Sequence, residues 1–530
     1  MKSFVSFLMA VCLIPSTSLA TPGDVSNKVG LPFHHPTGVA WDGQHLWVAD
    51  RKTDMFYEFD LAKQAIVDSI ASPGYFPSGL AWDGKLLWST DPSDAKIYAT
   101  DVATGKTVAT IDAPAAGPTG IAWEGESLWI CDNSDKRISK IDPTDGTTII
   151  SFKAPSTDPR SIVFGGGYLW CSDRLKDQIY MIDPGSGQVV LILDAPGKYS
   201  WGLGWKDGHL INADYQDDAI YEIIVKDGQQ FKTYEPRRAR IDFTSEATAS
   251  GAGSVTSLDI NYAVPQERPN QKMLKPILYS PQPSKLATDH WGQPIAVFHF
   301  DNLEPPQSVE VSMRLEIETS AIRYFIYPEA IAGEIPADIK KLYLADDIKY
   351  DITNPYIQKI VKDVVGPETN LYWKARKIFQ YLIENMEYQL SGGWNTAPTV
   401  LKRGNGSCSE YSFSYISLCR AAGVPARYVG SLVVRGDDAS YDDVFHRWCE
   451  IYLPGYGWVP VDANAGDREL PADQASAFGG IANRFLITTA GGGASEYLDW
   501  NYNAQSTSVT TGKCHIKIES IAEWEPLDTK

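Results

Sequence analysis

The chain has 530 residues and carries 66 acidic against 47 basic side chains, and a length of this order suits about two to four domains. Its formal net charge of −19 gives no general attraction to phosphate backbones or anionic lipid, which argues against a nucleic-acid partner. The sequence has no Cys-x-x-Cys pair, His-Glu-x-x-His motif or Walker-type glycine loop, so we expect neither a metal nor another cofactor.

The first twenty residues have the pattern of a secretory signal peptide. They hold one lysine, an apolar stretch from Phe4 to Ile14, and Ser18-Leu19-Ala20 as a small-x-small cleavage site. The apolar stretch is about half of the ~20 residues that a membrane-spanning helix needs, and no later segment is long and apolar enough. We therefore expect cleavage near Ala20, export to the periplasm or the extracellular space, and no membrane-spanning segment.

A 41-residue repeat fills residues 21–235. The sequence WDGQHLWVAD at position 41 recurs as WDGKLLWSTD at 82, WEGESLWICD at 123, FGGGYLWCSD at 164 and WKDGHLINAD at 205. Within each unit, short apolar runs separated by turn residues predict four strands. Four strands per 41 residues predict a five-bladed β-propeller, and the unit resembles the repeats of the NHL and related propeller families.

Two further expectations concern this propeller. The aspartates at equivalent strand ends, such as Asp50 and Asp91, could form a carboxylate ring for calcium, but an aspartate there more often caps a turn. The first and last blades must also meet without a free edge, so we expect residues 27–32 to supply the outermost strand of the last blade. The propeller is expected to bind a protein or glycan partner, or to position the substrate.

Strand patterning continues after the repeat ends near residue 236. Apolar and polar residues alternate over 258–264 and again over 309–318. Such alternation is typical of a sheet with one buried face and one wet face. We therefore predict a separate β-sandwich module over residues 236–325.

The periodicity becomes helical from about residue 353, in NPYIQKIVKDVVG and ETNLYWKARKIFQYLIENMEY. Strand patterns return after residue 426. An α+β core over residues 326–490 is therefore predicted, followed by closing strands over 491–530.

The stretch RGNGSCSEYSFSYISLCRAAGVPARYVG, at 403–430, places Cys408 after a Gly-Asn-Gly-Ser loop and at the start of a predicted helix. Unpaired amides and the helix dipole favour a thiolate there, and can lower a cysteine pKa from about 8.5 to roughly 3.5–7.5. A second stretch, HRWCEIYLPGYGWVPVDAN, supplies His446 on one strand and Asp462 on the next, beyond a hairpin turn. We predict that His446 takes the thiol proton, Asp462 orients the imidazole, and the Cys408 thiolate attacks a carbonyl.

Both stretches resemble the transglutaminase-like superfamily, whose core has a papain-like fold. The resemblance covers about residues 350–480 and implies that Cys408, His446 and Asp462 form the catalytic triad. The superfamily contains cysteine peptidases, amidases, cross-linking transferases and members that have lost the triad. We expect the oxyanion hole to combine the backbone amide of Cys408 with an upstream side chain, for which Trp394 is the candidate; packing is its alternative role.

We therefore predict a multidomain protein: a propeller, a sandwich and a papain-like core that hydrolyses an amide bond of a protein or peptide substrate. The alternatives are a cross-linking transglutaminase and a non-catalytic adhesion or scaffold protein that keeps the fold. Hydrolysis is favoured over transamidation because the roughly 40 residues after the core leave little for an amine-binding domain. Cys419 and Cys449 are expected to be core residues, and Arg427 is expected to be a structural ion-pair partner.

Overall fold

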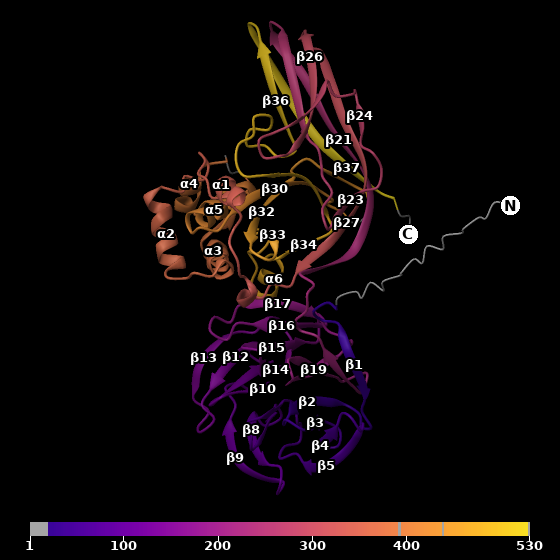
Figure 1. The fold of residues 1–530 in the computed structure, drawn as a ribbon, viewed down its shortest axis with the longest axis vertical. Coiled ribbons are helices and arrows are strands. Elements are labelled where there is room, and N and C mark those ends of the chain that lie inside the picture. The colour runs from indigo at the N-terminus through magenta and orange to yellow at the C-terminus, as the bar shows by residue number, and fades with distance from the viewer. Residues whose placement is uncertain (1–19, 391–393, 437–438, 528–530) are drawn as a thin grey trace, which may run out of the picture.

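The structure, a computed structural model, describes residues 20–390, 394–436 and 439–527. Apart from Ala20, the predicted signal peptide lies outside these residues. Figure 1 shows a propeller at one end of the molecule, a long sandwich at the other, and a helical layer with a small sheet between them. None of the helices in the described ranges is long and apolar enough to cross a membrane.

The N-terminal part consists of five four-stranded antiparallel sheets, which are the five predicted blades (Figure 1). The first four blades follow the chain order, β2 to β5, β6 to β9, β10 to β13 and β14 to β17, and the fifth has the order β1-β20-β19-β18. The strands are β1 (Val25–Gly30), β2 (Pro36–Trp41), β3 (Leu46–Asp50), β4 (Met55–Asp60), β5 (Ala65–Ala71), β6 (Leu80–Trp82), β7 (Leu87–Asp91), β8 (Lys96–Asp101), β9 (Lys106–Asp112), β10 (Pro118–Glu124), β11 (Ser127–Asp132), β12 (Arg137–Ile141), β13 (Thr148–Lys153), β14 (Pro159–Gly165), β15 (Tyr168–Asp173), β16 (Gln178–Ile182), β17 (Val189–Asp194), β18 (Ser200–Lys206), β19 (His209–Asp214) and β20 (Ala219–Ile223).

The first strand of the chain closes the last blade. β1 pairs antiparallel with β20, with Lys28 opposite Tyr221 and Val29 opposite Ile220. Val29 is the buried residue of this strand. The pairing confirms the closure predicted for residues 27–32, although the strand begins two residues earlier, and β1 is the outermost strand of the fifth blade.

The recurring aspartates cap turns. Asp50 Oδ1 accepts the backbone N–H groups of Lys52 and Thr53 at 2.7 and 3.0 Å. In the equivalent turn of the fifth blade, Asp214 Oδ1 accepts the backbone N–H groups of Gln216 and Asp217. These hydrogen bonds account for the repeated carboxylates without a bound cation.

The sandwich is built from two antiparallel sheets, with the orders β23-β27-β21-β37-β31 and β25-β26-β22-β36. The residues predicted as closing strands form β36 and β37, which pair with β22 and β21. The chain thus leaves the sandwich, forms the core, and returns to add the last two strands of the sandwich (Figure 1). The strands are β21 (Phe231–Ala252), β22 (Val255–Ala263), β23 (Gln271–Met273), β24 (Leu278–Ser280), β25 (Lys285–Thr288), β26 (Pro294–Leu303), β27 (Ser308–Tyr324), β31 (Ser440–Asp442), β36 (Ala504–Thr510) and β37 (Lys513–Pro526).

The core contains a four-stranded sheet, β33-β32-β30-β35, and a buried central helix, α5. Helix α5 packs on β32 and contacts α2, α3 and α4. Asn354 and Asn370 cap α2 and α3 by accepting backbone N–H groups. The elements are η1 (Pro328–Ala330), α1 (Ala337–Tyr343), α2 (Pro355–Val365), α3 (Leu371–Asn385), β28 (Glu387–Tyr388), α4 (Ala397–Arg403), β29 (Asn405–Gly406), α5 (Cys408–Ala421), β30 (Ala426–Val433), β32 (His446–Leu453), β33 (Gly457–Val461), α6 (Pro471–Ser476), β34 (Gly480–Ile481) and β35 (Phe485–Gly491).

The propeller is docked on the core through its fourth blade. Helix α6 lies against β17, and the backbone N–H of Ala472 donates to the carbonyl of Pro155 at 3.1 Å. The buried Arg376 of α3 donates to the carbonyl of Val189 at 3.2 Å. One hydrophobic cluster also runs from blades four and five into helices α2, α3 and α5. The fourth blade is therefore packed firmly against the core.

Candidate active site

Cys408 is the first residue of α5, as predicted, and the start of that helix is held by Glu410. Glu410 is fully buried, and its Oε2 accepts the backbone N–H of Ser407 at 3.2 Å and the guanidinium of Arg403 at 2.8 Å. Its Oε1 accepts the backbone N–H of Asn395 at 3.0 Å. The sequence signal for this residue is the capping-box spacing Ser-x-x-Glu.

His446 and Asp462 lie at the same end of the core sheet. β32 begins at His446, and β33 ends just before Asp462, with Cys449 opposite Val461 in the register between them. His446 Nε2 lies 2.7 Å from Asp462 Oδ2, while Asp462 Oδ1 accepts the backbone N–H of Ala465 at 3.0 Å. The carboxylate therefore occupies one ring nitrogen and leaves Nδ1 for the thiol.

The Cys408 thiol lies close enough to His446 for the imidazole to shift the pKa of the thiol. Burial alone would raise the pKa of Cys408, but the hydrogen bond and charge of His446, with a contribution from Arg447, bring this pKa below its ordinary value. Burial would lower the pKa of His446, but Asp462 and Cys408 raise it to about 10. Both shifts favour a thiolate beside an imidazolium, and the two groups titrate as a pair.

Arg447 is a fully buried residue that sequence reasoning missed. Its guanidinium donates to the carbonyl of Trp500, and its charge helps to lower the pKa of Cys408. Nε and Nη1 have no acceptor, and no carboxylate pairs with this guanidinium, within the described ranges. The guanidinium carbon lies 4.4 to 5.1 Å from the ring centroids of Trp394, Phe413, Tyr428 and Tyr502.

This cation adds positive charge near the thiol, because aromatic rings hold a guanidinium without neutralising it. The signal in the sequence is the alternation along β32. Arg447 shares its strand face with Cys449, Ile451 and Leu453, which are buried. A charged residue on an apolar strand face is unusual and often functional.

The structure places Trp394 in this aromatic shell. Its ring centroid lies 5.0 Å from the Arg447 guanidinium carbon and 6.4 Å from the Tyr502 ring centroid. Its φ of 52° is in the left-handed region, which is sparsely populated by non-glycine residues and often occurs at functional sites. This position is compatible with both of its predicted roles, and the oxyanion role stays a prediction.

The other cysteines of the core differ from Cys408. Cys419 and Cys449 are buried, and burial raises the pKa of both thiols. The Cys449 thiol donates to the carbonyl of Ser412 at 3.5 Å. These two thiols therefore stay protonated and belong to the packing of the core.

A group of possible metal ligands lies outside this site, in the first blade. Ligand atoms of Asp42, His45 and Glu58 lie within 4.8 Å of one another. Asp42, however, accepts the N–H groups of Gln44 and His45 and the indole N–H of a tryptophan. Asp83 makes the same three contacts in the second blade, where no histidine is present, so the arrangement is explained by turn capping.

Comparison with known proteins agrees with the resemblance of the two sequence motifs. Residues 358–463 match the family model of the transglutaminase-like superfamily. An uncharacterized protein of Haemophilus influenzae (strain ATCC 51907 / DSM 11121 / KW20 / Rd) is 32% identical over 158 residues, which are 24% of this chain and 42% of that protein. The uncharacterized protein YebA of Bacillus subtilis (strain 168) is 26% identical over 180 residues, 32% of this chain and 22% of that protein. The chain thus spans less than half of the length of these curated relatives.

Solved structures are similar to this chain over parts of its length. A proposed cysteine protease of Cytophaga hutchinsonii is 18% identical, with 57% of this chain and 94% of that chain covered and a TM-score of 0.38. A streptogramin B lyase is 19% identical, with 38% of this chain and 70% of that chain covered and a TM-score of 0.28.

Proposed function

We propose that the transglutaminase-like domain of residues 358–463 is a thiol enzyme that hydrolyses an amide or peptide bond. The observation that carries the proposal is that Cys408 and His446 lie close enough for each to shift the pKa of the other, while His446 Nε2 lies 2.7 Å from Asp462 Oδ2. A nucleophile, a base and a group that orients the base are the parts that covalent acyl transfer needs.

In the proposed reaction the Cys408 thiolate adds to the carbonyl carbon of the substrate. The tetrahedral intermediate collapses when protonated His446 gives its proton to the leaving amine, which leaves a thioester on Cys408. His446 then takes a proton from water as the water oxygen attacks the thioester carbonyl carbon. The C–S bond breaks with its electron pair on sulfur, the acid product leaves, and the thiolate–imidazolium pair of Cys408 and His446 is restored while Asp462 holds the imidazole.

The tetrahedral oxyanion is stabilised by donors at the start of α5. The backbone N–H of Cys408 is at the first helical residue and has no intrahelical acceptor. We propose Trp394 as the second donor and Arg447 as a fixed positive charge near the thiol.

The remaining parts of the proposal concern the setting of the reaction. Export rests on the signal-peptide pattern of residues 1–20, and the substrate is taken to be a protein or a peptide. The propeller is proposed to bind a protein or glycan partner, or to position the substrate. The positioning role is supported by helix α6, which follows the loop after Asp462 and contacts blade four of the propeller.

The test is activity profiling of the mature chain against peptide and cell-wall amide libraries, with Cys408→Ala as the inactive variant. Cys419→Ala, a buried cysteine of the same helix, is the matched control. We expect turnover, and labelling by a thiol-directed inhibitor, that depend on Cys408 and not on Cys419. Turnover that survives in Cys408→Ala would contradict the triad, and absence of both turnover and labelling would favour the scaffold alternative.

The same first half-reaction serves a cross-linking transglutaminase, in which an amine resolves the thioester instead of water. A glutamine-containing peptide incubated with a labelled primary amine separates the two outcomes. We expect release of ammonia with little amine incorporation. Efficient incorporation without competing hydrolysis would replace hydrolysis with transamidation.

A further inference from the structure

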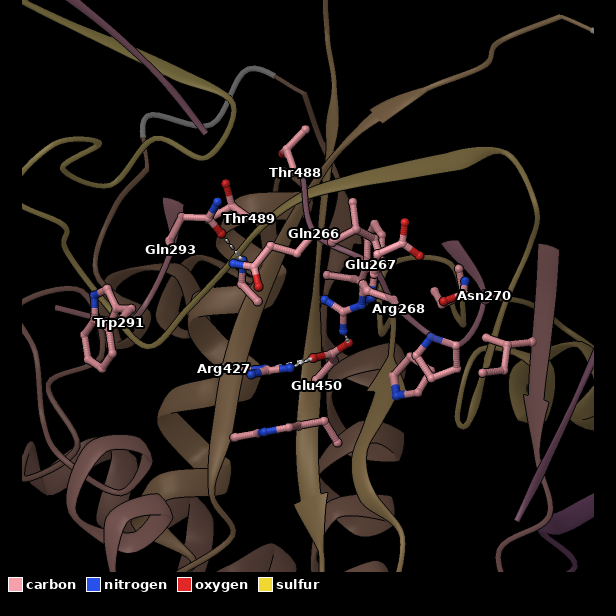
Figure 2. A pocket seen from close by; sticks show the side chains of 18 of the residues that line it. Gln266, Glu267, Arg268, Asn270, Trp291, Gln293, Arg427, Glu450, Thr488 and Thr489 are labelled. Atoms are coloured by element: carbon pink, nitrogen blue, oxygen red, sulfur yellow. Dashed lines mark hydrogen bonds and ion pairs between the residues drawn. The ribbon is translucent and has the colours of Figure 1, made fainter. Parts of the chain in front are cut away.

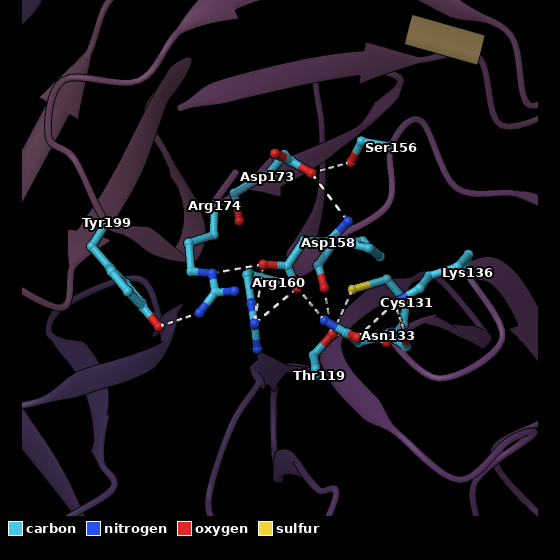
Figure 3. Close-up of polar contacts among 12 residues, drawn as sticks. Thr119, Cys131, Asn133, Lys136, Ser156, Asp158, Arg160, Asp173, Arg174 and Tyr199 are labelled. Carbon is cyan, nitrogen blue, oxygen red and sulfur yellow. Dashed lines mark hydrogen bonds and ion pairs between the residues drawn. The ribbon is translucent and has the colours of Figure 1, made fainter. Parts of the chain in front are cut away.

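A cavity of about 410 Å³ lies between the sandwich and the core sheet. Trp448 and Glu450 of β32 line it, whereas the residues that alternate with them on this strand pack toward α5. The cavity is therefore behind the sheet, on the face away from α5, and Cys408 does not line it. Segments 266–270 and 291–293 form the opposite wall (Figure 2).

Two arginines share one carboxylate in this cavity, as Figure 2 shows. Arg427 donates from Nε and Nη2 to Glu450 Oε2 at 2.8 and 2.6 Å, and Arg268 donates from Nη2 to Oε1. The Glu450 side chain is 4% exposed, and those of Arg268 and Arg427 are 18% and 15% exposed. The nearby Glu267 is exposed and accepts the backbone N–H of Met273, so solvent screens its charge.

Arg268, Arg427 and Glu450 together carry a net charge of +1, because two guanidinium groups share one carboxylate. Burial lowers the pKa of Arg268, although Glu450 opposes this shift, which shows the cost of holding this cation away from water. Arg268 Nε and Nη1 and Arg427 Nη1 have no hydrogen-bond acceptor in the part of the chain that the structure describes. A guanidinium with free N–H groups matches the two oxygens of a carboxylate.

The rest of the lining mixes aromatic and aliphatic side chains with uncharged polar ones. Trp291, Tyr324, Trp458 and Ile487 form the apolar part of the wall, and the Arg427 guanidinium lies 4.1 Å from the centroid of the Trp458 ring. The uncharged polar side chains include those of Gln266, Gln293, Thr488 and Thr489 (Figure 2). Pockets for small ligands have volumes of roughly 300 to 1,000 Å³, and a few polar groups in them orient the ligand. The apolar part of this wall therefore suits the body of a ligand whose anionic end meets the arginines.

We propose that this cavity binds a small organic carboxylate. The carboxylate contacts the free N–H groups of Arg268 and Arg427, and the apolar body lies against the tryptophans of the wall. None of the triad residues lines the cavity, although Trp448 of its wall stacks on His446 with ring centroids 5.8 Å apart. Binding of the carboxylate is measured without turnover, so this proposal can be tested independently of the proposed hydrolysis.

The test is isothermal titration calorimetry on the mature chain with three probes. 2-Naphthoate carries the charge and the apolar body, 2-naphthalenemethanol has the body without the charge, and inorganic phosphate has the charge without the body. We expect one naphthoate to bind per chain, and the other two probes to bind at least roughly tenfold more weakly. No binding of naphthoate, or equal binding of either other probe, would overturn the proposal.

Two variants locate the binding. Arg268→Gln removes one cationic partner and should weaken naphthoate binding at least roughly tenfold. Arg314→Gln is the matched control, because Arg314 pairs with Asp242 and is 56% exposed. Its naphthoate affinity should equal that of the unmodified chain.

The second variant, Ala490→Leu, covers the case in which Arg268→Gln does not fold. It keeps the charges, reduces the cavity, and should also abolish naphthoate binding. Naphthoate binding that survives in Ala490→Leu would place the ligand elsewhere and refute the site. The rate of Cys408 alkylation reports on the triad in every variant, so a failed hydrolase assignment and a failed carboxylate site are distinguishable.

Discussion

His446 Nε2 lies 2.7 Å from Asp462 Oδ2, and two backbone hydrogen bonds fix the position of Asp462. Its N–H donates to the carbonyl of Ala477 at 2.9 Å, and its carbonyl accepts the N–H of Gly466 at 2.9 Å. The segment between Gly466 and Ala477 contains α6, which contacts the propeller. Asp462, which contacts the imidazole, is therefore anchored where the core meets blade four.

Replacing the members of the triad should have unequal effects on turnover. Cys408→Ala and His446→Ala should each lower kcat by several orders of magnitude, because they remove the nucleophile and the base. Asp462→Ala should cost less, since the imidazole remains. The measurement is kcat and KM on a confirmed substrate, and near-native kcat in Cys408→Ala would contradict the assignment.

The pH dependence should be that of a thiolate–imidazolium pair. The pKa of Cys408 is lowered, so activity should hold below the ordinary titration range of a thiol and fall only when acid protonates the thiolate. The pKa of His446 is raised to about 10, so the loss on the alkaline side should be centred near that pH. Asp462→Asn removes the attraction that raises the pKa of His446, and the alkaline limb should move to lower pH.

Arg447 should contribute to the thiolate through its charge. Arg447→Met keeps an apolar side chain among the surrounding rings but removes the cation, so the pKa of Cys408 should rise. The midpoint of the pH profile of Cys408 alkylation should move up by roughly one pKa unit, which is a tenfold loss of rate on the acid limb of the profile. Arg447→Lys keeps the charge and should retain more of the rate. An unchanged alkylation profile in a folded Arg447→Met would show that Arg447 serves packing alone.

Glu410 should stabilise the start of α5. Glu410→Ala removes the acceptor for the N–H groups of Ser407 and Asn395 and leaves Arg403 without its carboxylate. The free energy of unfolding of the core should fall by about 2–4 kcal/mol, since a cap and a buried ion pair are both lost. Urea denaturation measures this, with Glu384→Ala, on the exposed face of α3, as the control.

The closing strand of the propeller should be sensitive at one position. Val29 is 4% exposed and pairs with Ile220 in the last blade, so Val29→Asp should destabilise the protein by about 3 kcal/mol or more. Asn27→Asp is exposed in the same strand and should change stability by less than about 0.5 kcal/mol. Equal melting temperatures of the two variants would mean that β1 does not hold the ring closed.

The sequence by itself determined the features that depend on local periodicity and spacing. The 41-residue repeat predicted five blades, because the strands within a repeat unit pair with neighbours close in sequence. The closing strand at 27–32 pairs with β20 at the other end of the propeller, and the repeat pattern predicted it because the segment precedes the first unit as a fourth strand precedes each later one. The motifs around Cys408 and His446 likewise predicted a cysteine at a helix start and a histidine on a strand before a hairpin, which the structure shows. Their roles as nucleophile and base stay predictions. Each motif holds its own helix start or hairpin, so its chemistry can be recognised without the rest of the fold.

Tertiary structure alone decided how distant segments meet. β37 pairs with β21 across more than half of the chain, Arg268 of the sandwich meets Glu450 of the core, and Arg447 is enclosed by rings from several elements. No periodicity encodes such contacts, because they are selected by packing among elements far apart in sequence and by the need to pair or enclose buried charge. The cavity between the sandwich and the core sheet, and the Arg447 cation near Cys408, both arise at these long-range contacts.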